Sequence, residues 1–111
     1  MSEAREPDFE PTILRLLQSE EKLQMAARAR DAILAVTDRR LVVADDQRVA
    51  LDIPYDSVRR VQFDIERARP ATLVIVPESP SDEPQILAIP PEEYDRAASA
   101  LAVIGQRLSE H

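Results

Sequence analysis

Cysteine is missing from the 111 residues of the sequence, and histidine and glycine occur once each. The absence of cysteine excludes disulfide bonds, thiolate metal sites and thiol catalysis. The single histidine is the last residue, His111, which excludes a serine–histidine–aspartate triad. The single glycine, Gly105, lies within a predicted helix, so a glycine-rich phosphate loop is excluded as well. We expect Gly105 to let that helix approach a sheet, although glycine costs a helix about 1 kcal/mol relative to alanine.

Long apolar runs are also missing. No segment approaches the roughly 18 consecutive apolar residues that a membrane-spanning helix needs, and no apolar signal region follows Met1. These absences predict a cytoplasmic protein. Apolar residues still make up 44% of the chain, which is ordinary for a globular protein, and the length suits one small domain.

Positive charge is scarce. The chain has 14 basic residues against 21 acidic ones, for a net charge of −7, and Lys22 is its only lysine. Nucleic acids and anionic lipids repel such a domain, because proteins bind both largely by neutralising phosphate. We therefore expect no nucleic-acid partner, and binding to membrane lipid is disfavoured.

The N-terminal third contains one segment that the pattern leaves open. Residues 1–10 are charged, and we interpret them as a flexible tail before a domain at residues 11–109. Pro11 suits the first turn of a short helix. The apolar face of that helix would hold Ile13, Leu14, Leu16 and Leu17. In residues 21–30 the composition favours helix, whereas alternating apolar residues favour strand. The alternating residues are Leu23, Met25, Ala27 and Ala29.

Six further segments are short, rich in valine, isoleucine and leucine, and separated by polar links, which is typical of strands. They are residues 32–37, 40–44, 48–53, 58–67, 71–76 and 85–89. Asp45-Asp46-Gln47 predicts a hairpin turn, residues 54–57 a corner, and residues 77–84 a loop. The core-facing side chains would include Val49, Leu51, Ile53, Val61, Phe63 and Ile65. Residues 71–76 are apolar on both faces and predict a central strand.

The clearest element is an amphipathic helix that begins after Pro90-Pro91-Glu92-Glu93. Its apolar stripe would hold Tyr94, Ala97, Ala98, Leu101, Ile104 and Leu108. Short links between strands imply antiparallel pairing, and the helix has one apolar stripe with which to cover a sheet. We therefore predict an α+β fold. It is a bent antiparallel sheet or open barrel of about seven strands, with a short N-terminal helix and an amphipathic C-terminal helix.

Several motifs, taken in order, resemble those of the bacterial pleckstrin-homology-like domains. They are Glu21-Lys22 after a short helix, Thr37-Asp38-Arg39-Arg40-Leu41, Ile53-Pro54-Tyr55 with Val58, and the helix ending "AVIGQRL". The resemblance covers roughly Pro11 to Leu108 and implies a strand in residues 21–30. It implies a pleckstrin-homology-like fold rather than an assigned activity, and several members of the family look like homo-oligomeric or scaffold modules. The sequence departs from the family in its glycine-free turn at residues 45–47 and its lack of lysines on the early strands, which argues against lipid-headgroup binding.

The candidate contacts for an anion or a protein partner are Arg39, Arg40, Arg59, Arg60 and Tyr55. Around Arg39 and Arg40 we favour a hairpin in which Asp38 accepts backbone hydrogen bonds and the two arginines pair with nearby carboxylates. Acidic residues lie close to Arg59 and Arg60 along the same segment, which favours a solvated strand of mixed charge. Tyr55 is a candidate anchor for a partner, although packing against Val58 is favoured.

Adjacent acids occur at Glu20-Glu21, Asp45-Asp46 and Glu92-Glu93, but neighbours on a turn or a helix start do not converge on one substrate or metal. We therefore expect no enzymatic activity, no metal and no cofactor. The sequence predicts a non-catalytic cytoplasmic interaction or scaffold module whose protein partner it does not name. The alternatives are a module that binds anionic lipid headgroups and a small acidic chaperone or adaptor for a basic partner.

Self-association is predicted from residues 71–76, whose two apolar faces need more cover than one helix supplies. A homo-oligomer would provide that cover. In the alternative, a monomer, the N-terminal helix covers the strand through Ile13, Leu14 and Leu17.

Overall fold

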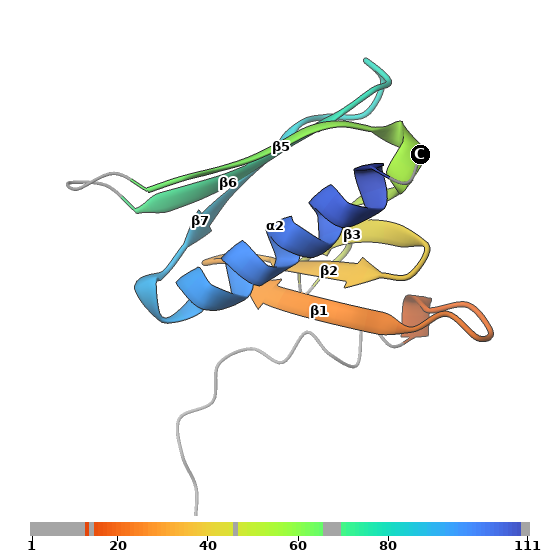
Figure 1. Ribbon diagram of the computed structural model, residues 1–111, viewed down its shortest axis with the longest axis horizontal. Coiled ribbons are helices and arrows are strands. Elements are labelled where there is room, and N and C mark those ends of the chain that lie inside the picture. The colour runs from red at the N-terminus through yellow and green to blue at the C-terminus, as the bar shows by residue number, and fades with distance from the viewer. Residues whose placement is uncertain (1–12, 14, 46, 66–69, 110–111) are drawn as a thin grey trace, which may run out of the picture.

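The structure is a computed structural model that describes residue 13 and residues 15–45, 47–65 and 70–109 (Figure 1). Within these residues it contains two antiparallel sheets and a C-terminal helix, which confirms the α+β prediction. The two sheets form an open arrangement and not a closed barrel. The flexible tail predicted for residues 1–10 lies outside the described residues.

The described strands are short and joined mostly by tight links. They are β1 (Leu23–Arg28), β2 (Ile33–Thr37), β3 (Arg40–Ala44), β4 (Val49–Pro54), β5 (Val58–Asp64), β6 (Ala71–Pro77) and β7 (Gln85–Ile89). The 3-10 turn η1 (Tyr55–Ser57) links β4 to β5, and a second, η2 (Pro91–Glu93), leads into α2 (Tyr94–Ser109). Ile13, Arg15 and Leu16 are also helical. No helix in the described part of the chain is long and apolar enough to cross a membrane.

The first sheet has the order β1-β2-β3-β4, and the second has the order β5-β6-β7. The predicted strand in residues 21–30 and the central position of β6 are therefore confirmed. The sheets meet at two corners. At one corner η1 turns the chain from β4 into β5. At the other, the Arg30 N–H, just after β1, donates to the carbonyl of Ala88 in β7 at 2.8 Å.

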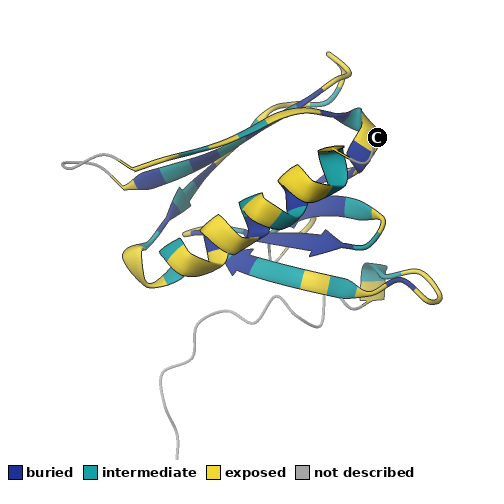
Figure 2. Ribbon diagram, viewed as in Figure 1, coloured by how far each residue is buried: buried dark blue, intermediate teal, exposed yellow. Residues whose placement is uncertain are grey.

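The main core lies between the two sheets, and α2 closes it by running across the space between them (Figure 1). From the helix, Ala97, Ala100 and Ile104 are fully buried, and the opposite side of α2 faces solvent (Figure 2). Near the start of the helix, Tyr94 meets Phe63 of β5 edge to face, with the ring centroids 6.0 Å apart. The helix therefore covers the interior of the sheets, as its apolar stripe predicts.

A second apolar cluster lies on the outer face of the first sheet. Ile13 is 2% exposed and packs against residues of β2 and β3. Those residues are Ile33, Ala35, Val42 and Ala44. The alternative in which Ile13 covers β6 is therefore wrong, because this residue packs against the other sheet. Leu14, which was expected to share that role, lies outside the described residues.

The turn between β3 and β4 confirms the hairpin prediction. The Asp45 carboxylate accepts hydrogen bonds from the N–H groups of Gln47 and Arg48, each at 2.7 Å. These bonds lower the pKa of Asp45, because they favour the charged form of its side chain. An aspartate that binds its own backbone in this way replaces the glycine that such a turn often uses.

A bulge changes the orientation of the first residues of β4. Val43 pairs with Leu51, but Ala44 pairs with Val49, so β4 contains one extra residue. As a result Val49 packs with the outer cluster and Ala50 packs with the main core. The prediction that Val49 faces the main core is wrong, whereas the prediction for Leu51 is confirmed.

The strand β5 ends sooner than its alternating sequence predicts. Val61 and Phe63 pack against the main core as expected, but Ile65 is 59% exposed. The last pair of the β5–β6 ladder joins Asp64 to Thr72, so no paired strand holds Ile65 over the core. The inward prediction for Ile65 is therefore wrong.

Two predictions for α2 also need correction. Ala98 is exposed, and the buried alanine is Ala100, which lies on the same side as Ala97 and Ile104. Gly105 is exposed too, and a β-carbon added there would meet no atom within 4 Å. The prediction that Gly105 lets the helix approach a sheet is therefore wrong.

We expect Ile104→Ala and Gly105→Ala to change the free energy of unfolding in opposite directions. The first change leaves a cavity at a fully buried residue and should cost about 2–5 kcal/mol. The second adds a methyl group in open space and should stabilise α2 by about 0.5–1 kcal/mol. Urea unfolding monitored by circular dichroism measures both changes.

The matched comparison is Leu101→Ala, which truncates a half-buried residue of the same helix and should cost less than Ile104→Ala. A destabilising Gly105→Ala variant would contradict the placement of this residue in open solvent.

Candidate functional site

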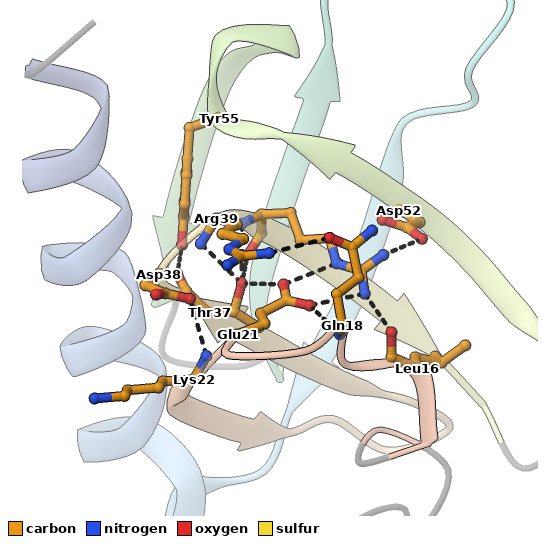
Figure 3. A network of polar contacts seen from close by, with 10 residues as sticks. Leu16, Gln18, Glu21, Lys22, Thr37, Asp38, Arg39, Asp52 and Tyr55 are labelled. Carbon is orange, nitrogen blue, oxygen red and sulfur yellow. Dashed lines mark hydrogen bonds and ion pairs between the residues drawn. The ribbon is translucent and has the colours of Figure 1, made fainter.

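Arg40, the first residue of β3, joins Leu16, Glu21 and Asp52 in one polar network through its side-chain hydrogen bonds. Figure 3 shows Leu16, Glu21 and Asp52 together with Thr37 and the other labelled residues of this network. The Arg40 guanidinium donates two hydrogen bonds to the Glu21 carboxylate, at 2.9 and 3.0 Å. It also donates to Asp52 of β4 at 2.7 Å and to the Leu16 carbonyl. Because these four residues come from separate segments, one side chain joins the N-terminal segment, the start of β1 and the β3–β4 pair.

Thr37, at the end of β2, completes the network from the other side of the hairpin. Its hydroxyl donates to Glu21 at 2.7 Å and accepts from the N–H groups of Arg39 and Arg40, at 3.0 and 2.9 Å. Thr37 is fully buried, so its hydroxyl needs these partners. The hydroxyl fixes the two-residue turn and orients Arg40 toward Glu21.

Asp38 and Arg39 take the structural roles that a hairpin requires. The Asp38 carboxylate accepts from the Lys22 N–H at 2.9 Å, which confirms that it binds backbone. Arg39 is exposed and donates to the Gln18 side chain at 3.3 Å, not to a carboxylate as expected. The prediction that arginine pairs with carboxylates is confirmed for Arg40 alone.

Tyr55 lies inside the molecule, on η1, and is 2% exposed. Its hydroxyl donates to the Thr37 carbonyl, which links the corner between the sheets to the network (Figure 3). Burial raises the pKa of Tyr55 to about 12. Its ring packs in the same buried cluster as Val58, as favoured, and does not contribute to the exposed surface.

The Glu21 carboxylate is charged and inaccessible to solvent. Burial raises its pKa, but hydrogen bonds from Arg40, from the Gln18 N–H and from Thr37 together outweigh burial, and the pKa falls from 4.5 to about 2. A buried carboxylate that is held ionised in this way requires its partners, because removing one would leave an uncompensated charge. The sequence reasoning missed this role of Glu21. Alternation gives no signal for it, because the register of β1 is irregular between Leu23 and Met25, which pack in different clusters.

Arg59 and Arg60 lie on β5, near its bulge. Val58 pairs with Pro77 and Arg60 pairs with Val76, so Arg59 is the extra residue. Both arginines are exposed, and neither side chain has an ion pair or hydrogen bond with a described residue. The structure therefore separates the predicted arginines: Arg40 is bound internally, Arg39 contacts the Gln18 side chain, and Arg59 and Arg60 have no side-chain partner among the described residues.

The outer face of the second sheet is a further candidate surface that the sequence reasoning did not define. Residues of β6 and β7 that point away from the core form a largely apolar group, which we call the outer patch. It consists of Thr72, Val74, Val76, Ile86 and Ala88. Ile86 is 70% exposed, and no described element packs over it. The first sheet has Ile13 over its outer face, whereas the outer patch has no such cover in the described chain.

We expect Glu21→Gln to destabilise the protein at neutral pH far more than at acidic pH. The pKa of Glu21 falls on folding from 4.5 to about 2. The ionised side chain therefore stabilises the fold fully above pH 4.5, and this stabilisation is lost as the pH falls from 4.5 through 2. That shift corresponds to about 3 kcal/mol at neutral pH. Denaturant unfolding at a series of pH values measures the difference between wild type and variant.

The control is Glu92→Gln, which neutralises an exposed acid at the start of the C-terminal helical segment. This variant should lose little stability at any pH. A difference between wild type and Glu21→Gln that stays constant from pH 7 to pH 2 would show that the charge of Glu21 is not what stabilises the network.

Comparison with known proteins supports the architecture. No protein-family model and no curated protein sequence matches the chain. Among solved structures, the chain is similar to a pleckstrin homology domain from Shewanella amazonensis SB2B, with a TM-score of 0.65 and 20% sequence identity. The similarity covers 91% of this chain and 98% of the other. At this level of identity the likeness establishes the fold alone: the chain has the pleckstrin-homology-like fold that its ordered motifs imply.

Proposed function

We propose that this domain is a non-catalytic cytoplasmic interaction module that associates with a second copy of itself through the outer patch. The observation that carries the proposal is the contrast between the two sheets. Ile13 packs over the outer face of the first sheet, whereas the outer patch includes an isoleucine that is 70% exposed. Apolar groups gathered on one exposed face are typical of a protein-binding surface.

The state of the charged residues supports a non-catalytic role. The Glu21 side chain is 0% exposed, and its partner Arg40, which is 14% exposed, donates to oxygen atoms of Glu21, Asp52 and Leu16. In this structure the Glu21 carboxylate therefore presents no surface to a substrate. The one buried carboxylate among the described residues is thus used to hold strands together and not to serve as an accessible acid or base.

We expect the wild-type mass in solution to rise above the monomer mass of 12.5 kDa as the concentration increases. The second sheet has three strands, so its face is only roughly 10 Å across between its outer strands. Such a face buries less than the roughly 800 Å² per partner of a standard interface, so the association should be weak. Light scattering from about 10 µM to about 500 µM covers dissociation constants in that range.

Ile86→Asp should abolish the rise in mass without unfolding the domain, because this side chain contributes little to the core. The control is Ile65→Asp, which places the same charge on the other exposed isoleucine, at the end of β5. A wild-type mass that stays at 12.5 kDa throughout would refute self-association. Equal effects of the two substitutions would refute the assignment to the outer patch.

A second candidate function, the binding of anionic lipid headgroups, is favoured by one observation. Arg59 and Arg60 are adjacent, exposed and without an ion pair to any described residue. Against it, Asp56 and Asp64 lie close by on the same part of the chain, and the net charge of −7 repels an anionic surface. We therefore rank it below the protein-interaction proposal.

We predict no salt-sensitive binding to vesicles that contain phosphoinositides at physiological ionic strength, because long-range attraction is screened and the net field is repulsive. Vesicle sedimentation measures this directly. Saturable binding by the wild type that disappears in Arg59→Ala/Arg60→Ala would overturn the ranking. That double variant is preferable to one at Arg40, whose loss would break the network around Glu21.

A further inference from the structure

The register of the second sheet places the charges along one side of the outer patch in a definite order. On the outward side of β5, Arg60 pairs with Val76, Gln62 with Val74, and Asp64 with Thr72. The next strand extends two of these rows, since Val74 also pairs with Ile86, and Thr72 with Ala88. The central row of the face, Gln62-Val74-Ile86, is therefore uncharged. On β5, Arg60 lies two residues before this row and Asp64 lies two residues after it.

We propose that two copies pack face to face through the outer patch about a two-fold axis along the central row, so that Arg60 of each copy lies opposite Asp64 of the other. This inference rests on the proposed self-association and specifies its geometry. A two-fold axis makes every contact reciprocal, so a surface must be complementary to itself. Arg60 and Asp64 are equidistant from Gln62 and opposite in charge, so a half-turn about the central row brings each opposite the other.

The same operation pairs the apolar residues with one another. The strands of the two copies run in opposite directions, β5 faces β5 and β6 faces β6, and Val74 and Ile86 each meet their own counterpart near the axis. Sheets that pack face to face keep their strand directions within about 30°, which preserves this alignment over short strands. Arg60 and Asp64 lie about 13 Å apart along β5, so the two ion pairs flank the apolar centre from both ends.

The contacts that Arg60 and Asp64 make within one copy leave both side chains able to form this ion pair. The Arg60 side chain has no ion pair or hydrogen bond with a described residue. Asp64 accepts one hydrogen bond, from the Gln62 amide at 2.9 Å, through one of its two carboxylate oxygens. No described residue donates to the other oxygen, so a guanidinium from a second copy can bind there.

The other two-fold packing of the same face is less favourable. With the axis along the strands, β5 of one copy would lie over β7 of the other, and Asp64 would lie over Ala88. That arrangement takes a carboxylate out of water without providing a cation, which costs free energy. The charge pattern therefore selects the axis across the strands.

Charge reversal tests the register. Arg60→Asp and Asp64→Arg each replace two attractive contacts with two repulsive ones, so each should weaken dimerisation by about tenfold at low salt. The double variant Arg60→Asp/Asp64→Arg exchanges the charges and should restore the dissociation constant to within about threefold of wild type. Mixing the two single variants should produce a heterodimer stronger than either homodimer, because both of its ion pairs are attractive. Sedimentation equilibrium measures all of these dissociation constants.

The matched control for Arg60→Asp is Arg48→Asp, which makes the same change of net charge but lies in the β3–β4 turn of the first sheet. It should leave dimerisation unchanged within about twofold, because its charge lies far from the interface and is screened. High salt should reduce the differences among the variants at residues 60 and 64.

The possible failures are distinguishable. If the wild type and Arg48→Asp dimerise, Ile86→Asp does not, and both single charge reversals dimerise normally, the register is wrong while the proposed self-association stands. Failure of the double variant to recover, or of the mixture to form a heterodimer, also refutes the register. A wild type that stays monomeric at every concentration refutes both proposals.

Discussion

The ion pair between Glu21 and Arg40 is the interaction on which the first half of the fold depends. The guanidinium binds Glu21 through two nitrogens and reaches Asp52 and the Leu16 carbonyl with its remaining donors. A carboxylate without solvent contact is stable only with such partners. The segment before β1, the β2–β3 turn and β4 are therefore held in one geometry by a single buried charge pair.

The sequence predicts the elements well because each has its own local signal. Alternation, proline and the Asp45 turn mark the strands and their boundaries, and the stripe through Ile104 marks the helix. The sequence fails where a local irregularity breaks the period. The bulge near Val49 reverses the orientation of one residue, and the early end of the β5 ladder exposes Ile65. Neither feature has a composition signal, since both depend on how a neighbouring strand pairs.

The candidate site is less predictable than the fold, because a pairing register decides which residues meet. The Thr-Asp-x-Arg turn is visible in the sequence, but the partner of Arg40 lies 19 residues away at Glu21. The outer patch likewise needs the register of three strands before Val74 and Ile86 appear as neighbours. The arginines of β5 are conspicuous in the sequence. Only the burial of Arg40, however, distinguishes a structural arginine from one that remains available to a partner.

The placement of the two tyrosines has a spectroscopic consequence. The chain has no tryptophan, so its intrinsic fluorescence comes from Tyr55 and Tyr94. Tyr55 is buried and bonded to Thr37, whereas Tyr94 contacts Phe63 where α2 meets the second sheet. Replacing either one with phenylalanine leaves a single emitter. The resulting pair of proteins would report separately on the corner between the sheets and on the docking of the helix, without any added label.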